Sequence, residues 1–191
     1  MASHPSRSRE RPLTGRRWAI ALALAACVLP GLAQTPSEPQ VKAAYLYQFT
    51  QFVTWPVEAF SGGVAAFNVC IAGRETAPFE PMQSRTAQGR PIRVKRFGRG
   101  DDVRACQVLF VPEAAESAFG EALRSARGLP VLTVGETEDF AAGGGIIGFL
   151  MREDRIQFAI NPDAAALSRL QVSAKLLRLA TIVRDARQVR P

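Results

Sequence analysis

The stretch at residues 67–73 constrains the fold more than any other part of the sequence. It reads Phe-Asn-Val-Cys-Ile-Ala-Gly, a short apolar run that contains β-branched residues and ends at a glycine. Such runs are typical of strands buried on both faces of a sheet. Similar runs follow at residues 92–97, 106–111 and 129–134, separated by helical segments or polar connections. Strands in this arrangement predict an α/β fold, a three-layer α/β/α sandwich with a mostly parallel sheet.

Helical patterns precede and separate these runs. Residues 41–53 predict an amphipathic helix, because apolar residues share one helical face at positions 41, 44, 45, 49, 52 and 53. This helix must end before Pro56, since proline cannot continue the hydrogen-bond ladder. Residues 113–127 have acidic residues first and basic residues last, the charge order that suits a helix dipole.

The C-terminal third predicts a hairpin followed by a helix. Two apolar runs, 146–151 and 156–160, are joined by a four-residue charged turn. This pattern indicates an antiparallel hairpin, which we place at one edge of the sheet. Three glycines at 143–145 indicate the entry to this hairpin rather than a phosphate-binding loop, because a strand follows them. The residues from 161 to about 187 predict one long helix with a basic side.

The N-terminus has the three parts of a secretory signal peptide. Arginines precede an apolar run from Trp18 to Leu29, and small residues lead to Ala33. We therefore predict a signal peptide over residues 1–33 and a periplasmic location. Residues 24–27, Leu-Ala-Ala-Cys, also resemble a lipobox, so lipid anchoring at Cys27 is the alternative to cleavage after Ala33.

Beyond the leader we expect a linker over residues 34–40 and a single domain over 41–188. The leader contains five arginines and one glutamate, so the formal net charge of +7 falls to +3 without it. A balance of +3 gives no reason to expect nucleic acid binding. Cleavage also removes His4, the single histidine, which excludes catalysis and zinc binding based on histidine. We predict no enzyme activity, no cofactor and no metal.

Two cysteines, Cys70 and Cys106, remain in the predicted mature chain. Exported proteins with an even number of thiols tend to pair them. The first and third strands of an open parallel sheet are commonly neighbours, which would bring these two sulfurs within reach. We predict a disulfide, worth about 4 kcal/mol in the chain-entropy picture. Two buried free thiols are the alternative.

Candidate partner-binding residues come from the aromatic and basic segments. The helix over 41–53 and the residues after it form the densest aromatic segment, and most of these side chains are expected in the core. Aromatic residues outside the core face predict a binding surface, and we name Tyr47 and Trp55. The basic side of the C-terminal segment is either solvated surface or a contact for an acidic partner or anionic lipid headgroups. Arg178 is our candidate there.

Motifs near both ends of the predicted domain resemble the YfiR family. Near the start, these motifs are Val-Lys-Ala-Ala-Tyr-Leu-Tyr-Gln-Phe at 41–49 and Val-Thr-Trp-Pro at 53–56. Near the end they are Ile-Gln-Phe-Ala-Ile-Asn at 156–161 and Val-Ser-Ala-Lys-Leu-Leu-Arg-Leu-Ala at 172–180. The resemblance spans essentially the whole mature chain.

The resemblance implies a non-catalytic periplasmic repressor that binds the sensor part of an inner-membrane diguanylate cyclase and lowers cyclic di-GMP signalling, and with it biofilm formation. It implies an OmpA-like outer-membrane lipoprotein as a second partner, a homodimer, and hybrid histidine kinases as other targets. Cys70 and Cys106 match one disulfide of the family pattern. The second cysteine pair of that pattern is missing near Gly148.

A small-ligand receptor that serves a membrane histidine kinase is the alternative function. Open α/β sheets bind ligands at the carboxyl ends of their parallel strands. In this sequence those ends are expected near Gly73, Pro112 and Gly135. The two functions are compatible if a ligand controls the contact with the partner.

Overall fold

A computed structural model of the 191-residue chain describes residues 35–60, 63 and 65–184. The predicted signal peptide, with Cys27 and Ala33, lies outside the described residues. All elements reported below belong to the compact unit that begins at Pro36. No helix in the described ranges combines the length and the apolar character needed to cross a lipid bilayer.

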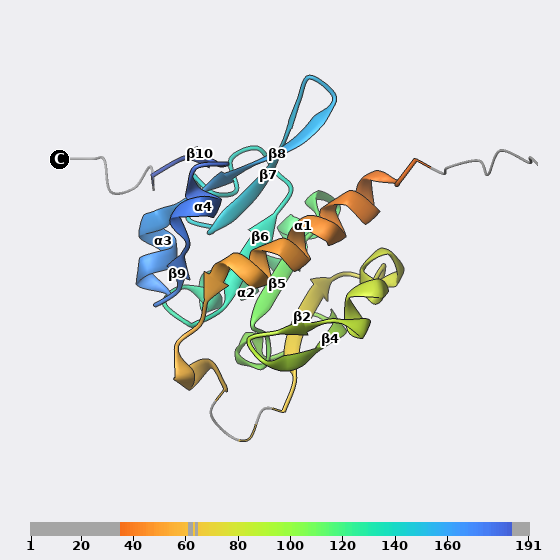
Figure 1. Ribbon diagram of the computed structural model, residues 1–191, viewed down its shortest axis with the longest axis vertical. Coiled ribbons are helices and arrows are strands. Elements are labelled where there is room, and N and C mark those ends of the chain that lie inside the picture. Colours follow the sequence, from red (N-terminus) through yellow and green to blue (C-terminus); the bar gives the residue numbers. More distant parts are fainter. Residues whose placement is uncertain (1–34, 61–62, 64, 185–191) are drawn as a thin grey trace, which may run out of the picture. The chain divides into compact units, whose positions relative to one another are not determined.

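A sheet of eight strands forms the middle layer of the described domain (Figure 1). The strand order is β10-β8-β7-β6-β5-β2-β4-β3. Five neighbouring pairs are parallel, while β7–β8 and β3–β4 are antiparallel. The predicted α/β class with a mostly parallel sheet is therefore confirmed. The strands are β2 (Phe67–Ala72), β3 (Thr86–Ala87), β4 (Arg90–Phe97), β5 (Val108–Val111), β6 (Leu132–Gly135), β7 (Ile147–Arg152), β8 (Arg155–Ile160) and β10 (Thr181–Ile182).

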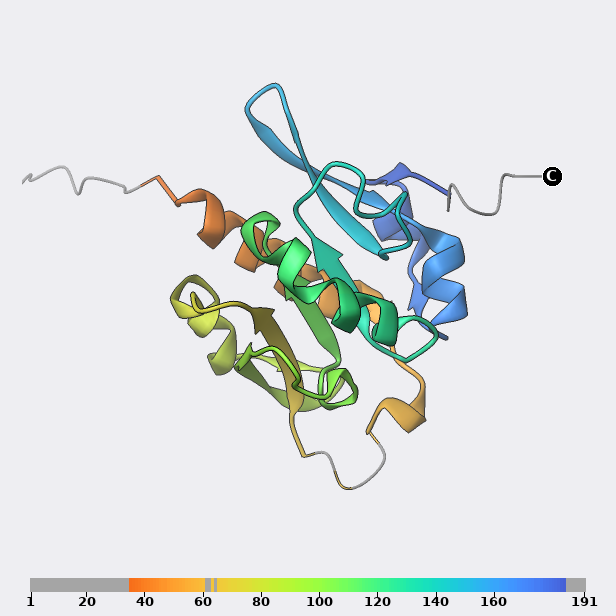
Figure 2. The same cartoon turned by 180° about the vertical axis from the view of Figure 1, so that it is seen from behind.

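Helices cover both faces of this sheet. Helix α1 (Glu38–Phe52) crosses the face seen in Figure 1, and α2 (Glu116–Ala126) crosses the opposite face seen in Figure 2. Alternate residues of β2 serve the two layers: Val69 and Ile71 join the core under α1, whereas Cys70 and Ala72 join the core under α2. The shorter elements are β1 (Val53–Thr54), η1 (Val57–Phe60), η2 (Ala77–Ser84), η3 (Val103–Ala105), η4 (Glu113–Ala115), α3 (Pro162–Leu167), β9 (Gln171–Val172) and α4 (Ala174–Leu177).

Helix α1 begins earlier than the sequence predicted. Its first residue is Glu38, so residues 38–40 of the expected linker form the first helical turn. The backbone N–H of Ser37 donates to Gln40 Oε1 at 2.8 Å. Pro39 lies in this first turn, where a missing N–H costs no helical hydrogen bond.

The prediction of one long C-terminal helix is wrong, because this segment contains α3, β9, α4 and β10. Helix α3 ends in a Schellman motif: Leu170 N–H donates to Ala165 O and Arg169 N–H donates to Ala166 O, both at 2.9 Å. Arg169 has a φ of 56°, a left-handed conformation that stops the helix. Leu170 is buried at 4% exposure, and β9 then pairs with β1 before Ser173 caps α4. Burial and strand pairing therefore override the helical spacing.

The predicted hairpin is present as β7 and β8. Glu153 and Asp154, at its turn, have φ values of 50° and 56°, as a two-residue type I′ turn requires. The hairpin is not the edge of the sheet, however. The two residues of β10 pair in parallel with β8 and lie outside it.

Candidate functional site

The predicted disulfide links β2 to Cys106, which lies two residues before the start of β5. Cys70 and Cys106 are bonded, with their Cα atoms 5.8 Å apart and a sequence separation of 36. Strands β2 and β5 are parallel neighbours, and Cys70 is the register partner of Leu109. Both cysteines are buried, at 3% and 2% exposure. The bond therefore braces the core between the sheet and α2.

Trp55 belongs to the core. Only 5% of the residue is exposed, and its indole N–H donates to the Gln107 carbonyl at 3.0 Å. Its ring meets that of Phe67 edge-on, with the centroids 4.9 Å apart. Trp55 consequently offers almost no surface to a partner in this conformation, and its position does not support the predicted binding role.

Tyr47 is half-buried on α1. The guanidinium of Arg85 lies 5.3 Å from the centre of its ring, within the range of a cation–π contact. Tyr47 is thus partly covered by its own chain. Its role in partner binding stays a prediction.

Arg178 is exposed at the end of α4, beside two exposed apolar residues. Leu179 is 70% exposed and Ile182 is 46% exposed. In the described part of the chain, β10 pairs with β8 alone, so its other backbone edge is open. We define Arg178, Leu179 and Ile182 as the β10 edge surface. The sequence did not indicate the two apolar members, because the residues from 161 to about 187 were predicted to form one long helix.

An ion-pair network lies directly after β6, where the sequence predicted a ligand crevice. Lys42 Nζ lies 2.8 Å from Glu136 Oε1 and 2.5 Å from Glu38 Oε1. Glu136 Oε2 also accepts a hydrogen bond from the backbone N–H of Glu113 at 3.0 Å. Burial by itself lowers the pKa of Lys42, but hydrogen bonds and charge attraction from Glu136 and Glu38 outweigh it, so the pKa is raised above its ordinary value.

A groove of about 720 Å³ runs along α2, on the face of the sheet shown in Figure 2. One wall is α2, with Gly120 and Arg124, and the other is the connection between β6 and β7. A hydrogen bond from Thr137 Oγ1 to Glu116 joins the two walls. Arg127 Nη2 joins them again by donating to the Gly143 carbonyl at 2.7 Å. The volume is in the range of small-molecule sites.

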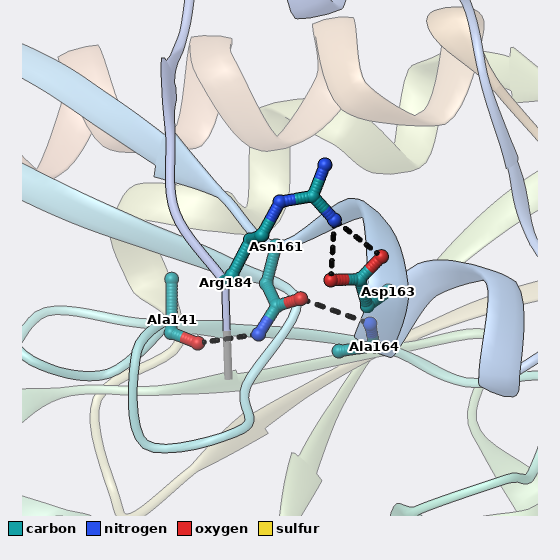
Figure 3. A network of polar contacts seen from close by, with 5 residues as sticks. All are labelled: Ala141, Asn161, Asp163, Ala164 and Arg184. Carbon is teal, nitrogen blue, oxygen red and sulfur yellow. Dashed lines mark hydrogen bonds and ion pairs between the residues drawn. The ribbon is translucent and has the colours of Figure 1, made fainter. Parts of the chain in front are cut away.

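The polar network in Figure 3 holds the chain around the start of α3. Asn161 caps this helix, because its Oδ1 accepts from Ala164 N–H at 3.0 Å while its Nδ2 donates to the Ala141 carbonyl at 2.9 Å. Arg184 Nη1 donates to both carboxylate oxygens of Asp163, at 3.1 and 3.0 Å. These contacts hold the start of α3 in place against Ala141 and Arg184, and they do not orient a reactive group. Within the described ranges, no group of three or more His, Cys, Asp or Glu residues could hold a metal ion.

The fold and these surfaces define a class of protein: a disulfide-braced, three-layer α/β domain with an exposed apolar strand edge and a ligand-sized groove along α2. The chain belongs to the YfiR/HmsC-like family, whose sequence profile matches residues 39–181. The resemblance found in the end motifs is thereby confirmed. No curated protein matches the chain. Membership in this family supports a periplasmic regulatory role in diguanylate cyclase signalling.

Proposed function

We propose that this protein is a non-catalytic periplasmic regulator that binds the sensor part of an inner-membrane diguanylate cyclase and holds cyclic di-GMP synthesis down. The match to the YfiR/HmsC-like family over residues 39–181 carries this proposal. A hybrid histidine kinase is the alternative target, and an OmpA-like lipoprotein as the releasing partner and a homodimeric state belong to the same proposal.

The β10 edge surface is the part of the domain that we assign to the cyclase. It combines two exposed apolar side chains, an exposed guanidinium and an open strand edge, and interfaces use all three features. Full burial of an exposed Leu or Ile side chain contributes about 1.5–3 kcal/mol. At 70% and 46% exposure, Leu179 and Ile182 together offer roughly 2–3 kcal/mol, a factor of about 30 to 150 in Kd.

A charge substitution in this surface tests the assignment. Cells that lack the gene are complemented with wild type, with L179D/I182D, or with V57D/M151D as the control. The control residues are also exposed apolar side chains, at 79% and 53%. We expect L179D/I182D to raise cyclic di-GMP to the level of the deletion strain, and the control to restore repression.

The partner is identified in the same strains by cross-linking and mass spectrometry of the membrane fraction. A GGDEF protein should be captured by wild type and by the V57D/M151D control, and lost with L179D/I182D. Cyclic di-GMP that does not change when the gene is deleted would refute the proposed function. Equal repression by both variants would refute the assignment of the β10 edge surface to the cyclase contact, but not the proposed function.

The groove along α2 supports a second candidate function, a small-ligand receptor that feeds a membrane histidine kinase. Its volume of about 720 Å³ suits a small molecule, and Glu113 and Thr137 place one end near the carboxyl ends of β5 and β6. Thermal-shift screening with amino acids and nucleotides tests it, because a true ligand raises Tm with concentration. R124E should abolish such a shift, since Arg124 lines the groove. A screen without any concentration-dependent shift would count against this function.

A further inference from the structure

Positive charge is concentrated at the β4 edge of the domain. Residues 85–104 contain seven Lys and Arg residues and two Asp residues, a net charge of +5. The other described residues contain ten Lys and Arg and thirteen Asp and Glu, a net charge of −3. The modest total charge therefore hides a strongly asymmetric distribution.

Four of these cations are exposed, and their side chains have no partner among the described residues. Arg93, Lys95 and Arg96 lie on β4, and Arg99 lies just after it. In the part of the chain that the structure describes, none of these four side chains has an ion pair, a hydrogen bond or a ring contact. We call these four residues the β4 basic edge. Arg85, Arg90 and Arg104 are excluded from it, because each already has a contact within the chain.

The four charges act together because they are close. At about 3.3 Å per residue, Arg93 and Arg96 lie roughly 10 Å apart along the strand, about one Debye length at 0.1 M salt. Ile92 packs in the core under α1 and Phe97 in the core under α2. By strand alternation, Arg96 projects on the α1 side and Arg93 and Lys95 on the α2 side. Because β3 pairs only with Arg90 and Pro91 of β4, the charges spread over both sides of a margin of the sheet that no described strand covers.

Protection against edge pairing explains only part of this pattern. Charged residues, especially lysine, commonly keep an edge strand from pairing with another sheet. That role does not account for Arg99, because the cations occupy positions 93, 95, 96 and 99 and so continue into the loop after the strand. Their concentration in an otherwise negative domain indicates attraction to an extended anionic object.

We propose that the β4 basic edge binds an anionic phospholipid surface and holds the domain against the membrane. A second copy of this chain is disfavoured as the occupant, since two such edges repel each other. An acidic protein segment fits less well, because specific carboxylate recognition uses bidentate, partly buried guanidinium groups, and these four side chains are exposed on two sides of a strand. Diffuse headgroup charge needs no such geometry, and each basic residue near it raises binding by about fivefold. The site is separate from the proposed cyclase contact and does not depend on it.

The test measures binding of the exported protein, purified from the periplasm, to lipid vesicles. The vesicles contain either phosphatidylcholine alone or phosphatidylcholine with about 30% phosphatidylglycerol, and binding is followed by co-sedimentation at low salt. R93Q/K95Q/R96Q/R99Q removes the edge charge. R124Q/R155Q/R169Q/K175Q removes the same charge from exposed positions elsewhere and serves as the matched control.

We expect wild type to bind the vesicles that contain phosphatidylglycerol but not those of phosphatidylcholine alone. This binding should weaken as the salt concentration rises. The edge variant should have a partition coefficient at least about tenfold lower, and the control should stay within about threefold of wild type. Circular dichroism and Tm establish that both variants are folded. An equal loss in both variants would mean a general charge effect and overturn the proposal. The proposal would also be overturned if wild type did not bind the vesicles but bound polyglutamate through these four residues.

Discussion

Substituting alanine for Gly145 tests the packing that joins the β6–β7 connection to the sheet. Phe140 in this connection is buried, with 5% exposure. A Cβ atom at Gly145 would lie 2.2 Å from Phe140 Cε1 and 2.8 Å from the Phe140 carbonyl oxygen. A Cβ atom at Gly135 would lie 2.1 Å from Cδ2 of the same ring. The ring therefore packs directly on two glycines, and neither position has room for a methyl group.

The expected cost of G145A is near the upper end of the overpacking range, about 3 kcal/mol. The ring cannot move away freely because Gly135 is against it as well, and the carbonyl contact involves backbone. Gly145 does not have a positive φ, so the effect is steric rather than conformational. For a chain of this size, a loss of 3 kcal/mol lowers Tm by roughly 6–12 °C.

Urea unfolding followed by circular dichroism measures this loss, with G120A as the control. A Cβ atom at Gly120, inside α2, would lie 3.5 Å from the flexible end of Arg124. Because that is ordinary contact and alanine favours helix, G120A should stabilise the protein by about 0.5–1 kcal/mol. In an F140A background, G145A should cost at least about 1 kcal/mol less than in wild type. An unchanged stability for G145A, or full additivity with F140A, would refute this packing.

Two further predictions concern the disulfide and the ion-pair network. Reducing the bond between Cys70 and Cys106, which closes a 36-residue separation, should lower the free energy of unfolding by about 4 kcal/mol, and equal urea midpoints for oxidised and reduced protein would contradict this. Lys42 has a raised pKa in the folded protein, so its stabilising contribution is complete below the unfolded-state pKa of about 10.4 and is lost as pH rises through the higher folded-state value. The destabilisation caused by K42M should thus stay constant from pH 7 to 9 and shrink above about pH 10.4, whereas a difference that already shrinks at pH 8 would contradict the raised pKa.

The central strands could be predicted because an unbroken apolar run indicates a strand buried on both faces. All six residues of β2 are buried, as its unbroken apolar run indicated. The pairing of β2 with β5 followed from the common order of parallel sheets, and the cysteines added a second constraint. The predicted face of helix α1 is only partly right. Phe49 and Val53 are buried and Tyr45 packs against the core, but Ala44 is exposed, and Leu46, outside the predicted face, is fully buried. Alanine is nearly neutral between core and surface, so it does not define a helical face reliably.

The β10 edge surface could not be predicted, because the segment before it folds differently from its pattern. Leu167, Leu170, Ala174 and Leu177 have the spacing of one continuous helix. The break depends on contacts with distant residues, namely the burial of Leu170 and the pairing of β9 with β1. Arg169 adopts the left-handed conformation that glycine usually marks in a sequence, so no local signal announced the end of α3.

The β10 edge surface and the β4 basic edge lie toward opposite ends of the sheet. Variants of the two surfaces should therefore respond differently to overexpression in the cell. Six strand spacings separate β10 from β4 in the sheet order, roughly 29 Å at about 4.8 Å each, so one molecule has room to touch a membrane and a projecting sensor domain together (Figure 1). Attraction to the membrane raises the local concentration of the regulator near its target without adding a contact to it. Overexpression should therefore restore repression to R93Q/K95Q/R96Q/R99Q, because mass action replaces the lost attraction, but should restore L179D/I182D far less. Dose–response curves of cyclic di-GMP against regulator level measure this. If the edge variant stays inactive at every level, its four cations act in the cyclase contact itself.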